Sequence, residues 1–345
     1  ESELDHARET LTSLLEVLID RTRPPLVISK LEGDAVLSYT PDSGILTGQT
    51  LVEIIEATYV AFRRAIELMV LNNTCQCNAC ANVSALDLKL FLHHGTFAIQ
   101  KVGEREELFG NDVVLTHRLL KNTISNDIGI RAYAAYTEAA LGQLGEELAE
   151  TMTRVDLDYG DVGPVTVWVQ DLHPVWAAQR DDPVVVLEQG DVDVEYSISL
   201  SMSPEMVWDY LSDRRFTNIL LGADRVEVVD QQHGRTMEGS TMQCYHGDKV
   251  VSQVILEWRP FHRIVTRDRL PNFGGRLQVL SVTELDPAGS GTLLTIKAGG
   301  ITGPALLRSV ARVVFKAGRK DFVAQGEAFR RRLDADHADR LTAAV

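Results

Sequence analysis

The second half of the chain carries seven strand-like segments, followed by a single long helical segment. The strand-like segments cover residues 192–200, 225–230, 240–246, 250–258, 263–270, 276–285 and 292–298. The helical segment covers residues 304–333 and carries one apolar stripe, made of Leu307, Val310, Val314, Ala317 and Phe322. A helix with such a stripe has to bury it, and the strands are the large partner that this half of the chain offers. The pattern predicts a sheet packed against the final helix.

Helical and strand-like segments alternate in the first half of the chain. Helical periodicity covers residues 51–71, 113–121 and 138–150, and strand-like runs cover residues 26–30, 35–39, 86–93, 96–102, 131–136 and 165–169. Two pairs of these runs predict hairpins, the first with Asp34 at its tip and the second turning at Gly95. Residues 173–189 are rich in turn formers, so we expect a linker there, between domains at residues 1–172 and 190–345. Both domains are expected to be α+β.

The composition limits which partners and which cellular compartment can be expected. A chain of 345 residues can bury two cores, and its net charge of −15 argues against a nucleic-acid partner. No apolar run reaches the roughly 18 residues of an integral membrane segment, and the acidic start at Glu1 is unlike a signal peptide. Three of the four cysteines lie within six residues, unlike a disulfide framework. This indicates a reducing environment, and we expect a cytoplasmic protein.

Two segments of the first half share a pattern with a known family. The first reads KLEGD at residues 30–34, and the second reads LFGNDV at residues 108–113. Together they resemble the class III adenylate and guanylate cyclases over residues 1–172, which implies a ferredoxin-like domain that binds a nucleotide. The resemblance implies that Asp34 binds magnesium or manganese and that Lys30 and Glu107 recognise the base. It also implies that Arg118 stabilises charge on the transferring phosphorus.

Three departures from the cyclase pattern argue against catalysis. The strand with the first metal-binding aspartate would precede Glu1, Val114 stands where the family has an asparagine, and the chain adds a loop with three cysteines. The family builds its site between two subunits, so the resemblance also implies a homodimer. We expect negligible cyclase activity. The alternative is an active adenylate cyclase that converts ATP to cyclic AMP, with its missing strand supplied by residues before Glu1.

The cysteine loop has the spacing of a metal site. Cys75, Cys77 and Cys80 form a Cys-x-Cys-x-x-Cys motif, and three thiolates so spaced can converge on one zinc ion. His93 and His94 are candidates for a fourth ligand. The alternative is that these cysteines are small residues in a surface loop of a reducing compartment.

The second half resembles the START or polyketide cyclase-like (SRPBCC, helix-grip) superfamily over residues 190–345. The resemblance rests on the order of the elements, on a helix start at Ser203 and Pro204, and on the segment MVWDYLSD at residues 206–213. It implies an apolar cavity, between the sheet and the helix, for a hydrophobic small molecule or lipid. The alternation of side chains along the strands and the helical stripe give the candidate ligand-binding residues Tyr245, Trp258, Leu277, Val310, Val314 and Ala317. The alternative is an ordinary filled core.

Together these features favour a non-catalytic sensor, in which ligand binding by the second domain is coupled to a cyclase-like dimerisation domain. The rival hypotheses are a regulated adenylate cyclase, a polyketide cyclase-like enzyme and a scaffold without a ligand. If Ala317 leaves space in a cavity, Ala317→Trp should block binding.

Overall fold

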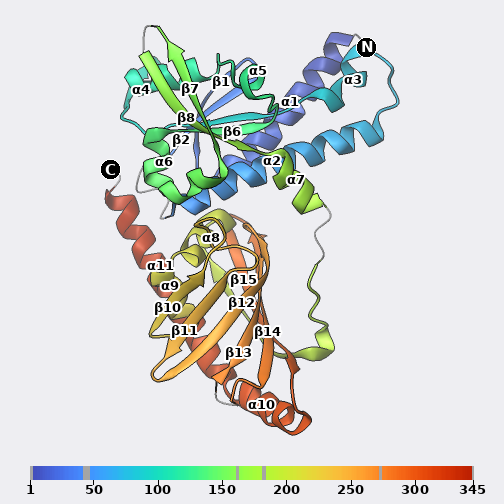
Figure 1. Cartoon of the computed structure of the whole chain (residues 1–345), viewed down its shortest axis with the longest axis vertical. Helices are drawn as coiled ribbons and strands as arrows, with labels where there is room; N and C mark the ends of the chain where they lie inside the picture. The colour runs from blue at the N-terminus through green and yellow to red at the C-terminus, as the bar shows by residue number, and fades with distance from the viewer. Residues whose placement is uncertain (1–2, 42–46, 161–162, 181–183, 272–273, 344–345) are drawn as a thin grey trace. The chain divides into compact units, whose positions relative to one another are not determined.

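Most of the expected elements occur in the structure, distributed over two units (Figure 1). The computed structural model describes residues 3–41, 47–160, 163–180, 184–271 and 274–343. The first unit comprises Glu1–Thr40 and Leu51–Asp182, and the second comprises Pro41–Thr50 and Pro183–Val345. Part of the expected linker is a helix of the first unit, α7 (His173–Arg180), and residues 181–183 of that linker lie outside the described residues.

A mixed four-stranded sheet forms the centre of the first unit. Its order is β3 (Lys89–Leu92), β6 (Tyr133–Thr137), β8 (Gly163–Asp171) and β7 (Thr153–Tyr159). β3 and β6 are parallel, and the other two pairs are antiparallel. All five residues of β6 are buried, as expected for a strand that is covered on both faces.

Helices cover both faces of this sheet. Ala134 and Tyr136 of β6 share a core cluster with residues of α1 (Glu3–Thr22) and α2 (Gly48–Asn72), while Tyr133 and Ala135 share one with residues of α4 (Asn111–Leu119) and α5 (Ile124–Ile128). Successive side chains of a strand point to opposite faces, so β6 contributes to two hydrophobic layers. The remaining short elements are α3 (Asn78–Ala81), η2 (Val83–Ala85), α6 (Glu138–Leu144) and η3 (Glu146–Thr151).

One of the two expected hairpins is confirmed and the other is wrong. β1 (Val27–Glu32) pairs with β2 (Ala35–Tyr39), as expected. β4 (Ala98–Val102), however, pairs with β5 (Arg105–Phe109) and not with the segment before Gly95. β3 has already ended at Leu92, and Asp112 packs closely against Gly95: a Cβ atom on Gly95 would lie 2.4 Å from Asp112 Cγ. The Asp112 carboxylate also accepts a hydrogen bond from the Thr96 backbone N–H at 2.7 Å.

A seven-stranded antiparallel sheet forms the second unit. Its order is β10 (Arg225–Asp230), β11 (Thr241–His246), β12 (Lys249–Arg259), β13 (Arg263–Leu270), β14 (Leu277–Ala288), β15 (Gly291–Thr302) and β9 (Val192–Leu200). Before β9 lies η4 (Gln189–Asp191), and between β9 and β10 lie α8 (Pro204–Ser212) and α9 (Arg214–Leu220). The start of α8 is confirmed: the Ser203 side chain accepts a hydrogen bond from the Met206 backbone N–H, and Pro204 is the first helical residue.

The final helical segment is two helices, not one. α10 (Ala305–Ala317) ends at Gly318, and α11 (Arg319–Ala343) begins directly after it. α11 packs against β9 and α9 (Figure 1), and Phe329 and Leu333 are fully buried. The expected stripe is therefore wrong over α10, where Val310 is 46% exposed and Ala317 is exposed.

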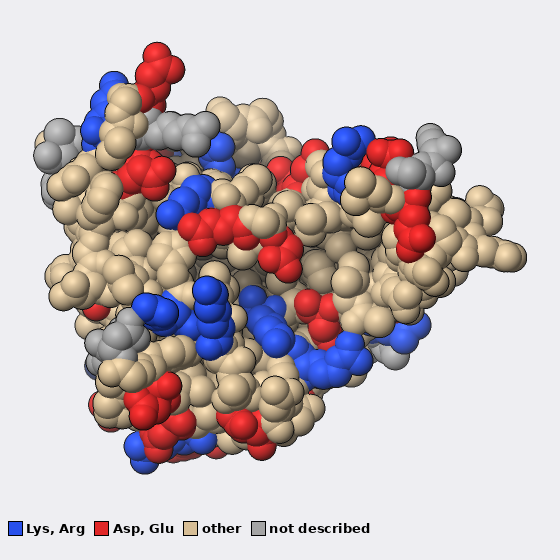
Figure 2. All heavy atoms as spheres, turned by 90° about the horizontal axis from the view of Figure 1, so that it is seen from above, with Lys and Arg blue, Asp and Glu red and all other residues tan. Residues whose placement is uncertain are grey.

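Charged groups of both signs occur at the surface. On the face shown in Figure 2, basic and acidic side chains lie next to one another in short runs among uncharged ones. No helix in the described part of the chain is long and apolar enough to cross a bilayer.

Candidate functional site

The second unit contains a cavity of about 550 Å³ between the inner face of the sheet and its helices. Side chains of β9 to β15, α9, α10 and α11 line it, and its walls are mostly apolar. Its aromatic lining residues are Tyr196, Trp258, Phe315 and Phe322. The space exists because several inward positions of β13 to β15 carry small side chains, among them Thr266, Ser281, Thr283 and Ala298.

A buried carboxyl group faces this cavity. Asp268 of β13 is 7% exposed and lines the cavity. Its Oδ1 accepts hydrogen bonds from Gln253 Nε2 at 3.0 Å and from Thr266 Oγ1 at 2.7 Å, and its Oδ2 accepts one from Ser281 Oγ at 2.5 Å. The Cys244 thiol donates in turn to Gln253 Oε1 at 2.9 Å. The network crosses four neighbouring strands and places a cluster of polar groups on the wall of the cavity.

Burial raises the pKa of Asp268 above the ordinary carboxyl range, and the three hydrogen bonds oppose this shift only in part. Burial therefore favours the neutral form of this carboxyl group. A carboxyl group with a raised pKa in a cleft is a frequent feature of functional sites.

The raised pKa predicts a pH dependence of stability. The folded chain holds the Asp268 proton at pH values where the unfolded chain, with a carboxyl pKa of about 3.9, has released it. The stabilising contribution is thus complete below about pH 3.9 and is lost as the pH rises through the folded-state pKa. We expect Asp268→Asn, which cannot ionise, to gain stability relative to the parent as the pH rises from 4 to 8. Urea unfolding of both proteins at several pH values in that range gives the difference in their unfolding free energies. A difference that does not change with pH would contradict the prediction.

The exposed part of the cavity lining includes basic groups as well as Val314, which is 54% exposed. Arg214 and Lys249 are exposed and His246 is half-buried. Among the described residues that line the cavity, Asp268 is the one acidic side chain. The lining therefore combines mostly apolar walls, one buried carboxyl group and exposed basic side chains.

Two of the six candidate ligand-binding residues line the cavity, namely Trp258 and Val314. Leu277 is fully buried in a small cluster with Val279, Ile301 and Ala311, and Val310 and Ala317 lie on α10 outside the described lining. Contact of any of these residues with a ligand stays a prediction.

Tyr245 was expected to face the cavity, but its strand places it on the opposite face of the sheet. Cys244 and His246 of β11 line the cavity, so the alternation of the strand directs Tyr245 to the other face. There the Arg225 guanidinium lies 4.0 Å from the centre of the Tyr245 ring, and the hydroxyl is 2.9 Å from Glu227 Oε2. Sequence alone did not distinguish the faces, because a shift of one residue exchanges them.

The sequence interpretation missed Asp268. The residue stands between Arg267 and Arg269, and three consecutive charged residues suggest a solvent-exposed strand. Both arginines are exposed on the outer face, while Asp268 is buried on the inner face. The strand period of two contained this signal: if both arginines face solvent, the residue between them must face the core.

The structure brings together two of the cyclase-like residues of the first unit. Lys30 Nζ lies 2.9 Å from Glu32 Oε1 and 3.8 Å from Glu107 Oε2. The Glu32 carboxylate raises the pKa of Lys30. Asp34 is exposed at the hairpin turn, and Arg118 is exposed on α4. Whether these residues bind a nucleotide or magnesium stays a prediction.

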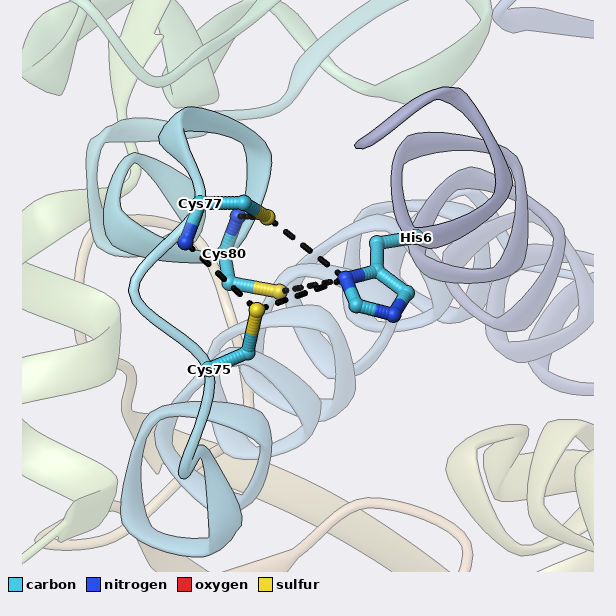
Figure 3. A group of neighbouring side chains, drawn as sticks. All are labelled: His6, Cys75, Cys77 and Cys80. Atoms are coloured by element: carbon cyan, nitrogen blue, oxygen red, sulfur yellow. Dashed lines mark hydrogen bonds between the residues drawn. The ribbon is translucent and has the colours of Figure 1, made fainter. Parts of the chain in front are cut away.

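The three cysteines of the loop face a histidine that the sequence interpretation did not name. Cys75, Cys77 and Cys80 direct their Sγ atoms at His6 of α1 (Figure 3). In the described part of the chain, these four residues are the one group of three or more His, Cys, Asp or Glu side chains close enough to share an ion.

The expected fourth ligand is therefore corrected. His93 is instead 3.1 Å from Asp112 Oδ1 through Nε2 and 2.9 Å from Thr137 Oγ1 through Nδ1. Both ring nitrogens of His93 therefore make hydrogen bonds within the first unit. In the described part of the chain, the group of side chains that could hold a metal ion does not include His94.

Comparisons with known proteins support the assignment of the second unit. Residues 191–334 match the family described as polyketide cyclase / dehydrase and lipid transport. Residues 11–128 match a family described as protein of unknown function (DUF2652), and not a nucleotidyl cyclase family. The cyclase resemblance and the ferredoxin-like fold of the first unit therefore stay hypotheses.

Several solved structures are similar to part of this chain at low sequence identity. MLL2253 from Mesorhizobium loti is 18% identical, covers 40% of this chain and 96% of its own, and has a TM-score of 0.33. The Aha1 dimer from Colwellia psychrerythraea is 10% identical, with 41% and 94% covered and a TM-score of 0.30. DynU16, from the dynemicin biosynthetic locus, is 18% identical with a TM-score of 0.31; the match covers 41% of this chain and about half, 46%, of DynU16.

A sequence relative defines the family. The uncharacterized protein Rv2561/Rv2562 of Mycobacterium tuberculosis is 30% identical to this chain over 165 residues, which are 47% of this chain and 73% of the relative. The chain belongs to the same family as this mycobacterial protein, and its residues 191–334 match the polyketide cyclase / dehydrase and lipid transport family.

Proposed function

We propose that this chain is a binding protein for an apolar small molecule, which the second unit encloses. The observation that carries the proposal is the cavity of about 550 Å³ with mostly apolar walls. Its volume lies within the range of pockets that bind small molecules. A well-packed core leaves no space of this size, so the cavity supports a ligand rather than an ordinary filled interior.

The lining indicates the chemistry of the ligand. Trp258, Phe315 and Phe322 suit an extended apolar body such as a lipid chain or a fused-ring polyketide. Asp268 suits one hydroxyl or carbonyl group, because its carboxyl group can accept a hydrogen bond when ionised and donate one when protonated. The exposed Lys249 or Arg214 side chain could then meet a polar end of the molecule.

A dye displacement titration tests this function. The full chain is titrated with the neutral apolar dye Nile red, and lipids and polycyclic aromatic compounds are then added as competitors. We expect the dye to bind in a saturable way with one site per chain, and compounds with one polar end to displace it. Binding that does not saturate, or that no competitor reverses, would refute an enclosed site.

The buried carboxyl group favours a second candidate, an enzyme of the polyketide cyclase kind. Asp268 has a raised pKa inside the cavity, as a general acid or base for a carbonyl substrate requires. The two candidates differ in the effect of Asp268→Asn. A carrier should keep most of its affinity in this variant, whereas an enzyme should lose turnover and still bind substrate.

For the first unit we keep the hypothesis drawn from the sequence, a dimerisation domain without catalytic activity. We propose that it is a non-catalytic partner domain of a ligand sensor and that it forms a homodimer. The exposed Val114 on α4 supports the absence of catalysis, because its side chain has no donor for a ribose oxygen.

We accordingly expect no cyclic nucleotide above background from the purified chain with ATP or GTP and magnesium or manganese. Mass spectrometry of the reaction mixture measures it. Product that disappears in Asp34→Ala would show instead that the first unit is an active cyclase, and the Lys30 side chain would then favour ATP.

A further inference from the structure

The four side chains of the cysteine cluster are arranged around a common centre. His6 Nδ1 lies 3.5 Å from Cys75 Sγ, 3.5 Å from Cys77 Sγ and 3.6 Å from Cys80 Sγ. All four ligand atoms lie within 4.8 Å of one another. Figure 3 shows the three sulfur atoms converging on the imidazole from the loop, while His6 reaches them from α1.

These spacings agree with tetrahedral coordination of zinc. Zinc binds sulfur at about 2.3 Å and imidazole nitrogen at about 2.0 Å. At a tetrahedral angle, these two bond lengths separate the sulfur and nitrogen atoms by about 3.5 Å. The three measured distances match that value. A zinc ion bound by all four groups would hold the three sulfur atoms at nearly equal distances from the nitrogen, as they are here.

The backbone around the cluster orients the thiolates. The Cys77 N–H lies 3.5 Å from Cys75 Sγ, and the Cys80 N–H lies 3.5 Å from Cys77 Sγ at the start of α3. Backbone donors of this kind fix the direction of ligand sulfur atoms and stabilise their negative charge. The loop therefore presents its sulfur atoms to a cation through its own fold.

We propose that His6, Cys75, Cys77 and Cys80 bind one zinc ion as a closed structural centre. Three thiolates and one imidazole bind zinc in preference to magnesium or calcium, which favour oxygen ligands. Four protein ligands complete the tetrahedron and leave no position for a substrate, so the centre is structural rather than catalytic.

The ion would connect two segments that are 69 residues apart, the start of α1 and the loop after α2. In the described structure, Leu14 is the one fully buried side chain of α1. Apolar burial alone therefore gives this helix little anchorage, and a bond through the metal would hold its first turns.

Elemental analysis of the full chain, purified without a chelator, tests the site. We expect about one zinc per chain, and cobalt substitution should give the visible absorption of a tetrahedral thiolate site. X-ray absorption of the zinc protein should show three sulfur neighbours and one nitrogen neighbour. Less than a tenth of an equivalent of zinc, iron in its place, or four sulfur neighbours would overturn the proposal.

A pair of histidine variants tests the fourth ligand. His6→Ala should lower zinc affinity at least tenfold in competition with a chromogenic chelator, and His94→Ala should leave it unchanged. Equal affinity for His6→Ala and the parent would exclude His6 as a ligand. The X-ray absorption result on the parent decides the question if His6→Ala does not fold.

Discussion

Replacing Ala298 by tryptophan is expected to weaken the binding of an apolar ligand in the second unit by at least about 100-fold, or about 2.7 kcal/mol. Ala298 lies on β15 and lines the cavity, so an indole at this position occupies space that a ligand would use. The parent cavity is already empty space, so the cost to folding should stay within the roughly 1–3 kcal/mol of an overpacked core. Nile red titration gives the affinity, and urea unfolding gives the stability.

Ala317→Trp is the matched control. The sequence predicted that this substitution would block binding, but the structure places Ala317 on α10, exposed and outside the described lining. We now expect Ala317→Trp to bind the dye as the parent does. Equal loss of binding in both variants would show that an added indole acts through the fold and not by filling the cavity.

Replacing Trp208 by alanine is expected to cost about 3–5 kcal/mol of unfolding free energy, as for other large buried aromatic residues. Trp208 of α8 is fully buried. Its ring centre lies 4.7 Å from that of Trp258 and 5.9 Å from that of Phe261. Because Trp258 lines the cavity, we also expect weaker dye binding in the fraction of protein that remains folded.

Urea unfolding, followed by both tryptophan fluorescence and circular dichroism, measures this loss of unfolding free energy. Trp176→Ala is the matched control, because the Trp176 indole is only partly buried on α7 and its loss should cost less. A cost below about 1 kcal/mol for Trp208→Ala would contradict the packing described for α8.

The sequence predicted the sheet of the second unit well because its signals are local. The strands at Val192–Leu200, Arg225–Asp230 and Arg263–Leu270 have the bounds that alternation and turns suggested. The helix start at Ser203 depends on a contact three residues away, which a sequence motif can encode. Local propensity and packing agree in these elements.

The features that could not be predicted depend on distant contacts. Asp112 packs against Gly95 from 17 residues further along the chain. The fourth side chain of the cysteine cluster is that of His6 in α1, 69 residues before Cys75. The break falls at Gly318, a residue type that often ends helices, but the sequence interpretation treated the apolar residues on either side of it as one stripe. The inward face of Asp268 was hidden by its charged neighbours.

Native mass spectrometry of the full chain, titrated with Nile red, tests the central claim that the second unit encloses one apolar molecule. We predict a single dye molecule per chain at saturation for the parent and for Ala317→Trp, and no bound dye for Ala298→Trp. No bound dye on the parent, or the same single dye on Ala298→Trp, would contradict an enclosed cavity lined by Ala298.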